Sequence, residues 1–143
     1  MAELLNVIVF TIGAVRYALE LRWVREVVTL GFVTGVASAP SAQGGVCKHH
    51  GTILPVLDLA VLLGSPATTP ARQGDGALVI ETDGVVCAVR IDQVDHVASL
   101  HATDGSVVDA AGRPLVLLDP MVVMKRALEA LSSPAKPGEA APP

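Results

Sequence analysis

The chain has little of what nucleic-acid-binding and disulfide-stabilised proteins need. Its 143 residues include one Trp, one Tyr and two Phe, and ten Lys and Arg scattered along a chain of net charge −4. Nucleic-acid binding normally uses a basic stripe, often with stacking aromatic rings, so we expect no nucleic-acid partner. The two cysteines, Cys47 and Cys87, come without an export signal and indicate reduced, buried thiols rather than a disulfide framework.

Segments that would direct the chain into a membrane are also missing. Residues 1–15 carry the acidic Glu3 and no basic region, unlike a signal peptide. The longest uncharged run, residues 27–47, contains a proline and four glycines and would make a poor bilayer helix. We therefore expect a cytoplasmic protein without membrane insertion. Its mean hydropathy of +0.55 indicates either a core rich in Val and Leu or apolar surface that a partner covers.

The pattern that is present is mostly that of short strands. Between residues 17 and 22 apolar side chains alternate with small or charged ones, which is typical of a half-buried strand. Asp83-Gly84 between two apolar runs predicts a hairpin turn. Helices are predicted at two places. Asp58 is expected to cap a short helical turn that extends to Leu63. Asp119-Pro120 is expected to begin a terminal helix over 121–131.

Two elements of the sequence occur twice, in the same order. Residues 18–27 match residues 88–97. Further along, residues 51–58 match residues 112–119, and both of these segments consist of a glycine turn, an apolar strand and a capping Asp. Chance similarity of Val-rich strands is the alternative, but two matches in the same order favour a duplicated β unit. We expect two small barrels packed against each other.

A set of short segments stands out along the chain: 10–13, 17–21, 24–27, 45–46 and, most specifically, the Gly-Thr-Ile-Leu-Pro-Val-Leu-Asp-Leu stretch of 51–59. Together they resemble the CheW-like domain, over roughly residues 4–131. The resemblance implies an all-β fold of two intertwined SH3-like five-stranded barrels with a short C-terminal helix. The first barrel would span roughly 14–70, the second roughly 76–118 plus the N-terminal strand, the helix 120–131, and a disordered tail 132–143.

The resemblance also implies a function without catalysis or cofactor. CheW-like adaptors join the cytoplasmic tips of methyl-accepting chemoreceptors to the regulatory domain of a chemotaxis histidine kinase, at receptor arrays. The first barrel would face the kinase, and a groove between the barrels would receive the receptor. Carried over by motif, partner contacts would lie at Val24, Glu26, Val27, Gly45, Lys48, His50 and Gly51. Structural roles would fall to Pro55, Asp58, Leu59, Gly112 and Asp119.

Elementary physics gives some of these residues a role of their own. Gly51 starts a strand directly after two histidines, so we expect it to take a positive φ. Pro55 cannot donate a ladder hydrogen bond and is expected at an edge or a bulge. Residues 53–57 are apolar on both faces, which suits a strand held between two lobes.

Two departures from the family pattern bear on the partners. Before the glycine the family has Asn, an apolar residue and Arg, whereas this chain has Lys48, His49 and His50. The family Arg can hold the carboxylate that matches Glu26 in a planar fork. An imidazole cannot, and near neutral pH it is charged only if its pKa is raised. We therefore hypothesise that a Glu26–His50 link is weaker or pH-dependent, which makes kinase binding uncertain.

The second departure is length. Residues 101–111 must serve as both loop and strand, because this stretch is several residues shorter than in the family. The second barrel is therefore expected to be trimmed or open on one side. An adaptor that binds the receptor but no longer binds the kinase is an alternative function.

Other classes of function have weaker support. Cys47, His49 and His50 with Asp58 could ligate a metal, but they lack the paired spacing of zinc sites, so we expect none. A thiol hydrolase using Cys47 with His50 or His96 would need a base and an orienting group in reach, so we expect no enzyme. Trp23 is either a packing residue or an interface anchor. A free-standing ligand-sensing or regulatory domain is a further alternative.

Overall fold

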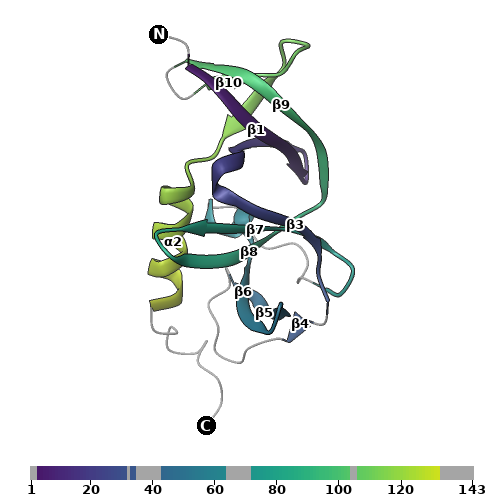
Figure 1. Cartoon of the computed structure of the whole chain (residues 1–143), viewed down its shortest axis with the longest axis vertical. Helices are drawn as coiled ribbons and strands as arrows, with labels where there is room; N and C mark the ends of the chain where they lie inside the picture. Colours follow the sequence, from purple (N-terminus) through teal and green to yellow (C-terminus); the bar gives the residue numbers. More distant parts are fainter. Residues whose placement is uncertain (1–2, 32, 35–42, 64–71, 104–105, 133–143) are drawn as a thin grey trace.

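A computed structural model describes residues 3–31, 33–34, 43–63, 72–103 and 106–132 of the chain. These residues form two β lobes with a helix along one side (Figure 1). That helix is α2 (Pro120–Ser132), and the lobes are named below by whether their strands close into a barrel. No helix within the described residues is both long and apolar enough to cross a bilayer.

The closed lobe is a barrel of five strands in the order β1-β2-β11-β10-β9. β1 lies between β2 and β9 and pairs antiparallel with both, whereas β11 pairs parallel with β2. Its interior holds small and aliphatic side chains, among them Val7, Val9, Leu100 and Val107. The strands are β1 (Glu3–Ile12), β2 (Val15–Glu20), β9 (Gln93–Thr103), β10 (Ser106–Val108) and β11 (Pro114–Leu117).

The open lobe is a six-stranded sheet in the order β3-β7-β8-β6-β5-β4. Among the described residues its two outer strands, β3 and β4, are not hydrogen-bonded to each other, so the sheet does not close. A short 3₁₀ turn, η1 (Leu21–Trp23), leads from β2 of the closed lobe into β3. The strands are β3 (Val24–Thr29), β4 (Val33–Thr34), β5 (Gln43–His49), β6 (Thr52–Leu57), β7 (Gly76–Thr82) and β8 (Val85–Ile91).

A shared hydrophobic core joins the two lobes. It takes Phe10 and Leu19 from the closed lobe, Leu57 and Ile80 from the open lobe, and Met124 from α2. The short helix α1 (Leu59–Leu62) follows β6 directly and adds Leu59, which is 1% exposed. Because this core draws on strands of both sheets and on α2, the lobes cannot separate without exposing it to water.

The duplicated sequence elements occupy equivalent places in the two lobes. The C-terminal strand of each repeat pairs parallel with the first strand of the other: β11 with β2, and β6 with β8. The register is also equivalent, with Leu117 opposite Ala18 and Val56 opposite Ala88. Ala18 and Ala88 are matched positions in the repeat, and so are Val56 and Leu117. This correspondence supports a duplicated unit whose two copies exchange strands.

The predicted fold class is confirmed: two intertwined β lobes and a C-terminal helix. One lobe is unclosed, as expected, but it is the sheet of β3–β8. The short stretch after Leu100 contributes to the closed barrel instead, with residues 104 and 105 outside the described part. The strands do not divide at 14–70 and 76–118 either, because β2 joins the closed lobe and β7 and β8 join the open one. Repeats 18–27 and 88–97 each cross from one lobe to the other.

Local predictions agree with the structure at the turns and helix starts. Asp83 and Gly84 form the two-residue turn between β7 and β8, with φ of 51° and 79°, which is the type I′ pattern. Asp119 Oδ1 accepts a hydrogen bond from the backbone N–H of Met121 at 2.9 Å, capping α2. The helix extends to Ser132, and the remainder of the predicted tail, 133–143, lies outside the described residues.

Candidate functional site

The candidate site is built on the tight hairpin between β5 and β6. His49 pairs with Thr52 across a two-residue turn formed by His50 and Gly51, whose φ angles are 49° and 79°. The positive φ predicted for Gly51 is confirmed, and His50 shares the left-handed conformation. Consecutive residues of a strand point to opposite faces, but the turn removes His50 from that alternation. The rings of His49 and His50 lie with centroids 4.0 Å apart.

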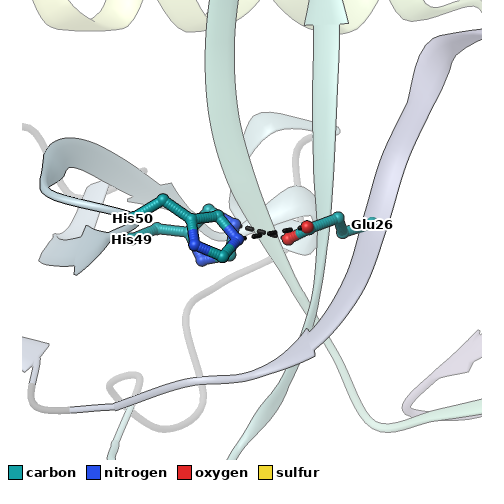
Figure 2. A group of neighbouring side chains, drawn as sticks. All are labelled: Glu26, His49 and His50. Atoms are coloured by element: carbon teal, nitrogen blue, oxygen red, sulfur yellow. Dashed lines mark hydrogen bonds and ion pairs between the residues drawn. The ribbon is translucent and has the colours of Figure 1, made fainter.

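Both histidines face one carboxylate on β3. His49 Nε2 lies 2.5 Å from Glu26 Oε2, and His50 Nε2 lies 3.2 Å from Glu26 Oε1. Figure 2 shows the two imidazoles reaching from the hairpin to Glu26. The hydrogen bond from His50, together with one from His49, holds the pKa of Glu26 below its usual value. The expected Glu26–His50 pairing is therefore present, and His49 joins it.

This Glu–His–His bridge spans the gap of the open lobe. In the sheet order, β7, β8 and β6 separate β3 from β5, so the link joins segments that no backbone ladder connects among the described residues. A cavity of about 340 Å³ lies beneath it, lined also by Arg25, Thr52, Leu54, Val79 and Val86. Side chains thus partly close a barrel that the backbone leaves open.

Exposed apolar side chains lie on the two elements that carry the bridge, β3 and the β5–β6 hairpin. Val27 on β3 is 51% exposed and Ile53 on β6 is 68% exposed. Val24 is half-buried and packs against the shared core. Lys48 is exposed and sits opposite Ile53 in the hairpin. We call Val27, Glu26, His50, Lys48 and Ile53 the hairpin face, meaning the end of the open sheet where β3 and the hairpin lie. By strand alternation Lys48 and Ile53 project from the opposite side of the hairpin to His49.

Gly45, expected at a partner contact, is buried beside β4. A Cβ at this position would lie 2.6 Å from the carbonyl oxygen of Thr34, and its φ is 131°. Neither condition suits another residue. Gly45 therefore allows β5 to approach β4 closely and shapes the strand that leads to the hairpin.

The residues expected to have structural roles lie mostly at turns and helix starts. Pro55 is opposite Val46 of β5, and pairing with β8 begins only at Val56, so Pro55 has a ladder on one side. The Asp58 carbonyl accepts the first hydrogen bond of α1, from Leu62, at 3.1 Å. Gly112 has a φ of 80° in the turn before β11. Ile53 is exposed, Leu54 and Val56 pack in the core of the open lobe, and only Leu57 reaches the core shared by the two lobes.

A buried ion-pair network in the closed lobe was not predicted. Asp109 is 6% exposed and pairs with Arg16 at 2.6 Å and Arg113 at 3.0 Å. It also accepts backbone hydrogen bonds from Ala111 and Arg113. The hydrogen bond from Arg16, aided by that from Arg113, holds the pKa of Asp109 well below its usual range. The signal in the sequence is an Asp three residues before a turn glycine, but Arg16 is remote in the chain.

The geometry is unfavourable for the thiol chemistry considered above. Burial raises the pKa of Cys47, and it raises that of Cys87 to about 12. A thiol nucleophile needs a lowered pKa and access. Cys47 packs in the core of the open lobe with Leu54 and Val56. Neither Cys47 nor Asp58 belongs to the group of possible metal ligands that the described residues bring together, which is Glu26, His49 and His50.

Trp23 packs rather than projects. It is partly buried against the shared core, and the guanidinium of Arg22 lies 4.7 Å from its ring centroid. Within the described residues its indole N–H is buried without a hydrogen-bond partner. The packing interpretation of this residue is therefore favoured over the interface one.

Comparisons with known proteins agree on one architecture. The family model described as the CheW-like domain matches residues 6–127. Among solved structures, the chain is similar to the scaffolding protein TtCheW from Thermoanaerobacter tengcongensis, with a TM-score of 0.65 and 18% sequence identity. That match covers 82% of this chain and 90% of the other. No curated protein sequence matches the chain.

Proposed function

The chain belongs to the CheW-like domain family, and from this premise we propose that it is a non-catalytic adaptor of a chemosensory array. It would couple the cytoplasmic tip of a methyl-accepting chemoreceptor to the regulatory domain of a chemotaxis histidine kinase, in the cytoplasm. The domain would span residues 4–131. The observation that carries the proposal is the family match over 6–127. The similar structure, TtCheW, is a scaffolding protein, which is in keeping with the proposal.

The hairpin face supplies a surface suited to protein docking. β3 is an outer strand of its sheet, and outer strands are ready points of contact for other chains. Val27 and Ile53 are more than half exposed next to the charged groups Glu26 and Lys48. Apolar side chains with a polar rim are what small docking surfaces use. We assign this face to the kinase regulatory domain.

The Glu–His–His bridge favours a second candidate, an adaptor that keeps only the receptor. A guanidinium fork would bind a carboxylate through two N–H groups of one planar side chain. Here two imidazoles divide that task, one for each oxygen of Glu26. The hairpin is consequently held to β3 by two imidazoles instead of one guanidinium. This link lies within the proposed kinase surface.

Separate binding measurements distinguish these candidates. The purified chain is titrated with a receptor cytoplasmic hairpin and, independently, with a kinase regulatory domain. The proposal expects both to bind; receptor binding alone supports the second candidate. Val27→Asp should abolish kinase binding, since it places a charge in the contact.

The matched control is Val108→Asp on β10 of the closed lobe. Val108 is also 51% exposed but lies outside the hairpin face. If neither partner binds the wild-type chain, or if both variants bind the kinase domain equally, the assignment of this surface is wrong.

A further inference from the structure

The bridge in the open lobe has the composition of a transition-metal site. Glu26, His49 and His50 each offer one ligand atom, and these atoms all lie within 4.8 Å of one another. Two imidazole nitrogens and a carboxylate oxygen suit zinc and neighbouring divalent metals. We propose that this cluster binds a divalent transition-metal ion of the zinc class, with water completing the coordination.

The spacing of the ligand atoms is close to that which such an ion needs. Tetrahedral zinc with bonds of about 2.0–2.2 Å holds its ligand atoms about 3.3–3.5 Å apart. In this structure the Nε2 atom of His49 lies 2.5 Å from Glu26 Oε2, and that of His50 lies 3.2 Å from Oε1. Each His–Glu separation therefore differs from the required spacing by about 1 Å or less. Rotation of the Glu26 side chain supplies such a movement.

The backbone prepares two of the three ligands. His49 ends β5 and His50 occupies the first turn position at a positive φ of 49°, so a two-residue turn fixes the distance between their rings. Their ring planes are tilted by 58°, and both Nε2 atoms are directed toward Glu26 (Figure 2). The third ligand comes from β3, and an ion would therefore tie the outer strand to the hairpin.

Solvent access and local charge also favour a cation. The side chains of His50, Glu26 and His49 are 75%, 41% and 23% exposed, so a hydrated ion can enter and retain a water ligand. An ion bound through two imidazole nitrogens and one carboxylate oxygen would meet a single negative charge. Arg25 lines the cavity below, but it pairs with Glu81 at 3.5 Å. Lys48, by strand alternation, belongs to the opposite face of β5 from His49.

Zinc titration of the tag-free chain, first stripped of metal with a chelator, tests this site. Isothermal titration should show one zinc ion bound per chain. His49→Gln and His50→Gln should each weaken zinc binding by about tenfold or more, since each removes one of three ligands. The matched control is His96→Gln, an exposed histidine on β9 of the closed lobe, which should leave binding unchanged.

A second measurement keeps the test decisive if a variant fails to fold. Imidazole ¹⁵N spectra of the wild-type chain should shift at His49 and His50 on adding zinc, and not at His96 or His101. The proposal is overturned if zinc binds more weakly than about 1 mM, if His96→Gln reduces binding as much as the hairpin variants do, or if the hairpin imidazoles do not shift. Because the chain is measured alone, this outcome is independent of the adaptor function.

Discussion

Truncation of Ile53 should weaken docking of the kinase regulatory domain without affecting the fold. Ile53 is the most exposed large apolar side chain of the hairpin face, at 68%. Complete burial of such a side chain is worth about 1.5–3 kcal/mol. Since 68% of it is left to be buried by a partner, Ile53→Ala should cost about 1–2 kcal/mol of binding free energy. That corresponds to about a 5- to 30-fold rise in Kd.

The assay is isothermal titration of the kinase regulatory domain with wild-type chain and variant. Stability should change by no more than about 0.5 kcal/mol, because the side chain has few partners in the free chain. Val108→Ala, half-exposed on β10, is the control and should keep the wild-type Kd. If Ile53→Ala binds as tightly as wild type, Ile53 is not covered by the kinase and the hairpin face is wrongly assigned.

Three further predictions concern the scaffold of the site and its bridge. Gly45→Ala should lower the free energy of unfolding in urea by about 1–3 kcal/mol, because its Cβ would meet the Thr34 carbonyl at 2.6 Å; Gly31→Ala, with open space around it, should be neutral. Asp109→Asn should destabilise the chain at pH 7. The matched control, Asp83→Asn, should be tolerated because its turn accepts Asn as well as Asp. The folded-state pKa of Asp109 is lowered, so its contribution is complete above the unfolded carboxyl pKa of about 3.9 and is lost as pH falls through the lower folded value. Wild-type stability measured from pH 7 to pH 2 should therefore fall more steeply in acid than that of Asp109→Asn, and equal slopes would contradict the network. His50→Arg should restore a guanidinium fork to Glu26 and change the Kd for at least one of the two partners; unchanged affinities for both would show that the bridge has no part in docking.

The paired lobes could be predicted from the sequence because the repeats carry local information. Glycine turns, apolar strands and capping Asp residues recur in order, and Asp83, Gly51 and Asp119 behave in the structure as these rules require. The distribution of strands between the lobes could not be predicted in the same way. Each repeat crosses from one lobe to the other, and that crossing depends on parallel pairing with the other repeat.

The candidate site was predictable only in part. The Glu26–His50 pairing follows from motif positions, but the meeting of both histidines on one carboxylate depends on the left-handed conformation of His50 in the turn. Neighbouring residues on a strand are otherwise expected on opposite faces. The pairing of Arg16 with Asp109 joins distant parts of the chain and leaves no local pattern. Long-range side-chain partners of this kind emerge only when the sheet is assembled.

Assembly of a three-component complex tests the adaptor function most directly. An immobilised receptor cytoplasmic hairpin is incubated with the kinase regulatory domain, with and without the chain. Retention of the kinase domain only when the chain is present is the predicted result, with loss of the kinase but not of the chain for Val27→Asp. If the chain does not bind the receptor hairpin, or does not bind the kinase domain, the account is contradicted.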